Sequence, residues 1–152
     1  MSDHLLKIIS TDPMFCCSNE TADRIAAYIR DNVFFSVQRL TVDYSVRKDP
    51  SFVDCASNLE SITCPCCGKK LDFAWWGKAM DIAYKHKFRQ REIVLPCCGK
   101  SSSLDSLNYY YDCGFSRVEF DLWNPVAIPD NDCIRMIEKM LGTTVKIIEA
   151  HL

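Results

Sequence analysis

The sequence predicts a mixed α+β fold, and three observations carry the prediction. An apolar run, an amphipathic helical stretch and an alternating run follow one another at the N-terminal end. The same strand–helix–strand order returns at the C-terminal end, and two cysteine motifs lie in the segment between the ends. If the two ends share one sheet, the chain forms a split βαβ, or ferredoxin-like, sandwich of four antiparallel strands with two helices on one face. Residues 48–114 are then an insertion into a single domain of residues 1–152.

The N-terminal end supplies the first two strands and the first helix. His4–Ser10 is a short apolar run, and we predict a strand there. Ser18 or Asn19 can cap the helix that follows. Apolar residues recur in this helix with the spacing of one buried face: Ala22, Ile25, Ala26 and Ile29. Phe34–Arg47 is the second predicted strand, because apolar and polar residues alternate over its second half.

The C-terminal end repeats this order. Arg117–Trp123 alternates between polar and apolar residues and is a predicted strand, which Pro125 ends. Asp130 is placed to cap the next helix, and Gly142 is placed to end it. The apolar positions of that helix are Cys133, Met136, Ile137 and Met140. Val145–Leu152 is the last predicted strand.

The insertion has elements of its own. We predict a helix at about Phe73–Lys87 and a strand at about Phe88–Leu95. One face of the helix carries Trp76, Ala79, Met80 and Ala83. An alternative is a single α/β sheet in which the strand of the insertion is a full member.

Length, composition and charge exclude several classes of protein. At 152 residues the chain has the size of one domain, and 48% hydrophobic with 25% charged residues is ordinary for a soluble globular protein. The net charge of −2 creates no strong field for nucleic acid or an anionic membrane. No apolar run approaches the roughly 20 residues that span a bilayer. The first residues do not resemble a signal peptide, so we expect a cytoplasmic protein whose ten cysteines are mainly thiols.

The cysteine motifs predict a metal site. CPCCG covers residues 64–68, and PCCG covers residues 96–99. In the first motif two cysteines are spaced C-x-x-C, and the glycine after them allows the tight turn that directs backbone N–H groups at sulfur. The second motif looks like the same knuckle without its first cysteine. We therefore predict a zinc-ribbon-like subdomain with one zinc ion, held by Cys64, Cys67, Cys97 and Cys98.

Several alternatives to this ligand set stay open. Cys66 can replace a neighbouring cysteine, and His86 is a further candidate for a fourth ligand. Iron also accepts four thiolates, and buried cysteines without metal are common core residues. A site closed by four cysteines has no position for water or substrate, so it stabilises the fold and does not catalyse a reaction. The remaining scattered cysteines are expected to be small core residues: Cys16, Cys17, Cys55, Cys113 and Cys133.

Several short motifs, spread over most of the chain, resemble a bacterial family of uncharacterised proteins of similar length. They are FVDCASN at 52–58, CPCCG at 64–68, WW at 75–76, LPCCG at 95–99, SLDSL at 103–107, GF at 114–115 and NP at 124–125. Some members carry the name sugar transporter ATPase. The resemblance implies a shared fold and metal site but no reaction. This chain departs from the family at Asp112 and Cys113, where an apolar or proline-containing turn is expected, so the resemblance gives Cys113 no role as a ligand.

The function that we expect is a non-enzymatic protein-interaction or binding module with a structural zinc ion. The closed metal site and the lack of a catalytic motif favour this reading over an enzyme. Aromatic residues that could contact a protein partner gather in and near the insertion: Phe73, Trp75, Trp76, Tyr109, Tyr110 and Tyr111.

Two other functions remain as alternatives. One is a zinc-ribbon module that binds nucleic acid through a local basic cluster, Lys85, His86, Lys87, Arg89 and Arg91, although an acidic chain makes this the weaker choice. The other is an enzyme with a pocket near Asp54, Asn58 and Trp75. His4 and His151 could also lie close together, because both belong to predicted strands at the chain termini.

Overall fold

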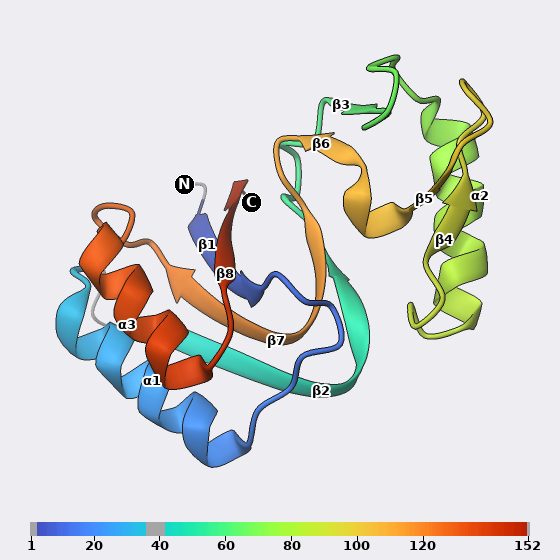
Figure 1. Ribbon diagram of the computed structural model, residues 1–152. Helices are drawn as coiled ribbons and strands as arrows, with labels where there is room; N and C mark the ends of the chain where they lie inside the picture. The colour runs from blue at the N-terminus through green and yellow to red at the C-terminus, as the bar shows by residue number, and fades with distance from the viewer. Residues whose placement is uncertain (1–2, 36–41, 152) are drawn as a thin grey trace.

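The computed structural model describes residues 3–35 and 42–151, and its fold is mixed α+β with antiparallel sheets. The main sheet has four strands in the order β2-β7-β1-β8 (Figure 1). These strands are β1 (His4–Ser10), β2 (Val42–Val53), β7 (Gly114–Trp123) and β8 (Val145–His151). The α+β class is therefore confirmed, as is the expected pairing of the second long strand with the strand that ends at Trp123.

Two helices cover one face of this sheet, α1 (Asn19–Asn32) and α3 (Asn131–Leu141) (Figure 1). The Ser18 hydroxyl accepts a hydrogen bond from the N–H of Thr21, and the Asp130 carboxylate caps α3 in the same way. Gly142 ends α3 with a φ of 91°, a left-handed conformation that glycine adopts at little cost. Apolar residues fill the core below the helices, and its central members are Leu6, Ile8, Ala22, Ile25, Ala26, Ile29, Val118, Phe120, Leu122 and Ile137.

The segment between β2 and β7 forms a second layered unit. It contains α2 (Phe73–Lys85), a 3₁₀ turn (Leu104–Ser106) and four short strands: β3 (Ser61–Thr63), β4 (Glu92–Val94), β5 (Ser101–Ser103) and β6 (Asn108–Tyr110). Among the described residues, the short strands form two separate sheets, β3 with β6 and β4 with β5, and neither sheet includes a strand of the main sheet. The alternative of one continuous α/β sheet is therefore wrong. Figure 1 shows this unit and the pair α1 and α3 at opposite sides of the main sheet.

A second core joins the insertion to the main sheet. Phe115 of β7 contacts Phe52 of β2, with ring centroids 5.2 Å apart, and it also contacts Phe88 of the insertion at 5.4 Å. Trp76 of α2 contacts Phe52 at 5.7 Å. The buried members of this core come from both units, and they include Ile9, Val53, Ile62, Met80, Leu95, Leu104, Phe115 and Ile148. The sheet therefore has one core on its helical face and a separate one shared with the insertion.

The second strand is displaced toward the C-terminus relative to its prediction at 34–47. It continues to Val53, so the chain leaves the main sheet after residue 53 and not at Lys48. Residues 36–41 of the predicted strand lie outside the described part of the chain. Pro50 lacks an N–H, and the register of β2 against β7 shifts between Val46 and Ser51. Lys48 to Pro50 has the composition of a turn, and pairing resumes beyond it because Phe52 and Val53 can be buried.

The helix and strand of the insertion are shorter than predicted. The helix ends at Lys85, because Lys87 and Phe88 adopt positive φ values of 56° and 54°. This turn buries Phe88 and leaves only Glu92–Val94 as a strand in place of 88–95. In the described part of the chain, no helix is both long and apolar enough to cross a membrane.

Gly114 begins β7 where the main sheet meets the insertion. A Cβ atom there would lie 2.6 Å from Cδ1 of Ile9 and 2.8 Å from Cε of Lys146. Ile9 is buried, and the ammonium group of Lys146 is held by the carbonyl of Cys113 at 2.6 Å. A larger residue would have to displace the ends of both side chains, so this close approach favours glycine.

Candidate metal centre

The two cysteine motifs fold into turns with the same backbone hydrogen bonds. The N–H of Gly68 donates to the carbonyl of Cys64 at 3.0 Å, and the N–H of Gly99 donates to the carbonyl of Leu95 at 2.8 Å. Both glycines are left-handed, with φ values of 76° and 73°, which explains their place in the motifs. The second turn is therefore the same knuckle, with a buried leucine where the first has Cys64.

Four sulfur atoms from these turns converge. The ligand atoms of Cys64, Cys67, Cys97 and Cys98 all lie within 4.8 Å of one another. The sulfur atoms of Cys64 and Cys98 are 3.9 Å apart, and those of Cys67 and Cys97 are 3.3 Å apart. Four thiolates around zinc, at Zn–S distances of about 2.3 Å, place their sulfur atoms about 3.8 Å from each other. The four thiols are thus close enough to hold a metal ion.

The backbone of the first turn favours a thiolate at Cys64. The N–H groups of Cys66 and Cys67 each lie 3.3 Å from its sulfur atom. Burial opposes ionisation, but hydrogen bonds outweigh it and lower the pKa of Cys64 to about 6. Burial and hydrogen bonds with the neighbouring thiols raise the pKa of Cys97 to about 12. A divalent cation would favour the thiolate form of both groups, so its binding would release protons.

The alternative ligands lie differently. Cys66 is exposed, and its contribution to this cluster is a backbone N–H, while its thiol is not among the converging ligand atoms of the described residues. His86 is exposed at the C-terminal end of α2 and also does not belong to that group. The arrangement therefore favours four cysteines, two from each knuckle.

This cluster connects two distant parts of the insertion. The first knuckle follows β3, the second joins β4 to β5, and α2 lies between them in the sequence. Four thiolates fill a tetrahedral coordination sphere and leave no open position for water or substrate. A metal ion held by all four cysteines would therefore have the closed coordination of a structural site.

The structure separates the residues of the suggested enzyme pocket. Trp75 lines a hollow of about 370 Å³ between α2 and β4, together with Ile82 and Val94. Asp54 lies instead at the junction with the main sheet, where its carbonyl accepts a hydrogen bond from Lys7 at 2.8 Å. The side chain of Asn58 donates to the carbonyl of Glu149 in β8 at 3.1 Å. Asp54 and Asn58 thus fasten a loop to the sheet, away from the hollow beside Trp75.

The basic cluster is partly occupied by internal contacts. Arg89 forms an ion pair with Asp49 and donates to the carbonyl of Lys48. Arg91 pairs with Asp105 at 3.1 Å and donates to the carbonyl of Phe88. Two arginines of the cluster are therefore engaged in internal ion pairs near the C-terminal end of α2. These ion pairs reduce the positive charge that a nucleic acid would meet.

The expected proximity of the terminal histidines is confirmed. His4 and His151 are paired in register, and their rings stack with centroids 4.9 Å apart. Among the cysteines expected in the core, Cys55, Cys113 and Cys133 are buried, whereas Cys16 and Cys17 are only half-buried.

Two other groupings were not foreseen from the sequence. The buried thiols of Cys55 and Cys113 touch, with their sulfur atoms 3.4 Å apart. Glu119 and Asp121 point to the face of β7 opposite the helices, and Arg47 donates to Glu119 at 2.7 Å. The alternation of apolar and polar residues in β7 indicates that Glu119 and Asp121 share one face of the sheet, the face that the insertion adjoins.

Comparisons of the chain with protein-family models, with curated proteins and with solved structures found no match.

Proposed function

We propose that this protein is an interaction module whose insertion is held together by one structural zinc ion. The ligands are Cys64, Cys67, Cys97 and Cys98. The observation that carries the proposal is the convergence of their four sulfur atoms within 4.8 Å, from two knuckles of the same backbone geometry. An all-thiolate set of this size suits zinc, with iron as the competing ion. The role of the ion is to fix α2 and the β4–β5 hairpin relative to one another.

Metal analysis of the purified protein tests the first half of this proposal. We expect about one zinc ion per chain, as a single tetrahedral site requires. Replacement of the ion by Co²⁺ should produce the visible absorption of a tetrahedral cobalt thiolate, which distinguishes four sulfur ligands from mixed sets. Purified protein without metal, with all four thiols reacting freely in the folded state, would refute the site. An absorption spectrum typical of an iron–thiolate centre would support the same four ligands but identify the ion as iron.

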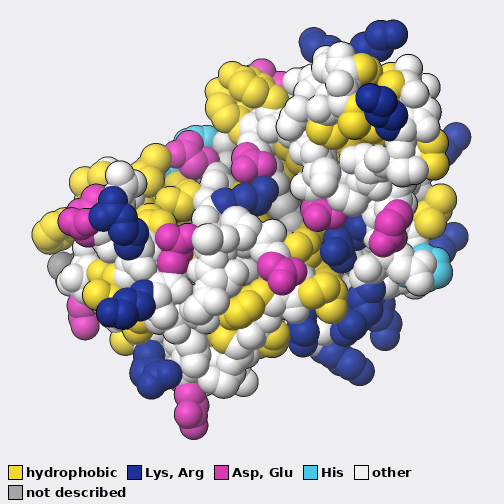
Figure 2. Space-filling view, viewed as in Figure 1, with side chains coloured by type: hydrophobic (Ala, Val, Ile, Leu, Met, Phe, Trp, Pro, Cys, Tyr) yellow, Lys and Arg dark blue, Asp and Glu magenta, His cyan; other side chains and the backbone are white. Residues whose placement is uncertain are grey.

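The surface that we assign to a partner lies on α2 and β4. Ile82 and Val94 are 61% and 64% exposed, which is unusual for large apolar side chains that face the same hollow. Trp75 also lines this hollow and is partly buried, and Lys78 is a further lining residue. Figure 2 shows apolar side chains reaching the surface over the insertion, with Lys and Arg side chains around them. An apolar centre with a polar rim is typical of a protein contact surface.

A charge placed in this hollow should abolish partner binding without unfolding the protein. Ile82→Glu adds a carboxylate at an exposed helix position, so the stability of the fold should change little. The matched control is Met136→Glu, at an exposed position of α3. In affinity capture from the source cells, wild type and the control should retain the same specific protein and Ile82→Glu should lose it. Equal capture by all three proteins would place the contact elsewhere, and no specific capture by wild type would count against the module itself.

We also propose that the main sheet and its two helices belong to the ferredoxin-like class of α+β folds. The strand order β2-β7-β1-β8, with α1 and α3 on one face, supports a ferredoxin-like split βαβ sandwich. The knuckles support a zinc-ribbon-like subdomain within residues 48–114. A reducing compartment such as the cytoplasm suits ligands that must remain thiolates. Membership of the bacterial family that the motifs resemble would imply the same site in its other members.

A further inference from the structure

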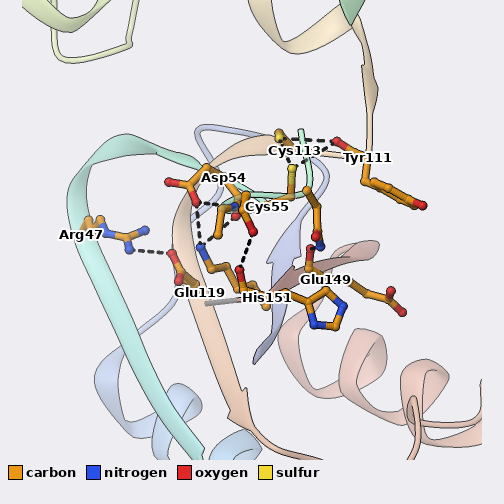
Figure 3. A network of polar contacts seen from close by, with 12 residues as sticks. Arg47, Asp54, Cys55, Tyr111, Cys113, Glu119, Glu149 and His151 are labelled. Atoms are coloured by element: carbon orange, nitrogen blue, oxygen red, sulfur yellow. Dashed lines mark hydrogen bonds and ion pairs between the residues drawn. The ribbon is translucent and has the colours of Figure 1, made fainter. Parts of the chain in front are cut away.

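A pair of buried thiols lies at the junction between the main sheet and the insertion. Cys55 and Cys113 are 0% and 1% exposed, and the thiol of Cys113 donates to the sulfur of Cys55 at 3.4 Å. Both sulfur atoms also lie near the carbonyl of Tyr111, at 3.5 Å and 3.6 Å (Figure 3). Neither cysteine belongs to the metal cluster.

The two residues occupy the two chain segments that connect the insertion to the sheet. Cys55 lies two residues after Val53, the last residue of β2, and Cys113 directly precedes Gly114, the first residue of β7. Val53 and Gly114 are themselves paired in register, so the segments leave the sheet side by side. A covalent bond between the two sulfur atoms would close the whole insertion into a ring at its base.

The pair is buried, but residues next to it in the sequence are at the surface. Asp54 and Asp112, the sequence neighbours of the two cysteines, are exposed, as is Tyr111. The surrounding contacts hold the backbone in place: the ammonium group of Lys146 donates to the carbonyl of Cys113 at 2.6 Å, and Ser57 donates to the carbonyl of His151 at 3.0 Å. The sulfur atoms therefore stay together, and a small oxidant needs only a local opening to reach them.

We propose that Cys55 and Cys113 are a modification site, at which hydrogen peroxide oxidises the two thiols to a disulfide. In the first step the sulfur of Cys55, as the thiolate, attacks one oxygen of the peroxide. The O–O bond breaks, Cys55 becomes a sulfenic acid, and the other oxygen leaves as water with the former thiol proton. The sulfur of Cys113 then attacks the sulfur of Cys55, the S–O bond breaks and a second water leaves with the proton of Cys113. Two thiols are oxidised and one peroxide is reduced to two waters.

The order of attack follows from the surroundings of the pair. Burial and the hydrogen bond to Cys55 raise the pKa of Cys113, so Cys113 remains a thiol and is the poorer first nucleophile. Its contact with Cys55 makes the second step fast, because the two sulfur atoms need no search. The first step should be slow, and the sulfenic acid should not accumulate.

Treatment of the reduced, zinc-loaded protein with hydrogen peroxide tests this proposal. Free thiols are alkylated after unfolding, and the disulfides are mapped by mass spectrometry of the peptides. We expect a cross-linked pair of peptides containing Cys55 and Cys113 as the first disulfide, and its complete loss with dithiothreitol. Cys133→Ser, at another buried cysteine, should form the same cross-link at the same rate. If both cysteines remain fully alkylated while other cysteines are oxidised, the proposal is wrong.

A trap for sulfenic acid separates the two steps. With Cys113→Ser, dimedone should label Cys55, whereas wild type should show little label because Cys113 resolves the intermediate. Equal labelling of Cys55 in wild type would show that Cys113 does not resolve it and would overturn the mechanism. If the Cys113→Ser variant does not fold, the cross-link in the wild-type protein still tests the proposal.

Discussion

Replacing Cys67 with serine is expected to release the metal ion and unfold the insertion, while the main sheet with α1 and α3 stays folded. The substitution removes one of four ligands and leaves three, a set that holds zinc far more weakly. Structural zinc binding contributes about 10 kcal/mol or more of folding free energy in small zinc peptides. Without the ion, the insertion is held by two short two-stranded sheets, which are marginal on their own, and by the core that it shares with one end of the main sheet.

The unfolding should be local because the two cores are separate. Leu6, Phe120 and Ile137 belong to the core between the sheet and the helices, which contains no residue of the insertion. Met80 and Leu95 belong to the other core, which the insertion shares with one end of the sheet. Loss of α2 exposes the second core but leaves the first intact.

Tryptophan fluorescence and hydrogen exchange would report this result. Trp75 and Trp76 lie in α2, so their emission should shift to the red, over a constant background from Trp123 of β7. The matched control is Cys66→Ser, which changes an adjacent exposed cysteine outside the converging group and should keep the metal. Rapid exchange of amides in β1 and β7 of the Cys67→Ser protein would show global unfolding. Retention of full protection in α2 after metal loss would show that the ion has no structural role.

The sequence predicted local features well and long-range ones less well. The caps at Ser18 and Asp130 and the two glycine turns depend on residues within a few positions of each other, and all have the expected geometry. The extent of β2 past Pro50 depends instead on the partner strand, which supplies pairing on the far side of the irregularity. Sequence alternation alone cannot reveal that support.

The cysteine and carboxyl groupings also divide into those set by local sequence and those set by long-range contacts. The knuckle cysteines could be named because each pair lies within one short motif, and the structure brings all four thiols together. Cys55 and Cys113 are far apart in the sequence, and only the register of Val53 with Gly114 brings them into contact. The alternation of β7 places Glu119 and Asp121 on one face, but their burial could not be predicted, because it depends on what covers that face.

Glu119 and Asp121 are expected to make the stability of the protein depend on pH. Burial and the neighbouring Glu119 raise the pKa of Asp121 to about 8, and one carboxylate oxygen of Asp121 is buried without a hydrogen-bond partner in the described structure. Burial also opposes ionisation of Glu119, but hydrogen bonds from Asp121 and Arg47 outweigh it and lower its pKa. Lys7 is the other cation that acts on both acids. At neutral pH we therefore expect one proton on the pair, held by Asp121.

A raised pKa in the folded state makes the protein less stable as the pH rises. Between the ordinary value of 3.8 and about 8, folded Asp121 keeps a proton that the unfolded chain has released. The free energy of unfolding then falls with pH, by up to about 1.4 kcal/mol per pH unit for one proton. Above about 8 both states are ionised, and the loss is complete.

Asp121→Asn should remove this pH dependence and stabilise the protein at its alkaline end. The asparagine amide can still donate to Glu119, but it cannot ionise, so the buried pair never carries two negative charges. The matched control is Asp43→Asn, which removes the exposed carboxyl opposite Asp121 in the register of β2 and β7 and should keep the wild-type slope. Urea unfolding of the three proteins, followed at a series of pH values from about 6 to about 9, measures the slopes. We compare the two variants at each pH because any change in metal occupancy then affects both equally. A gain in stability for Asp121→Asn that grows with pH is the expected result, whereas parallel curves for the two variants would show that Asp121 is already ionised in the folded protein.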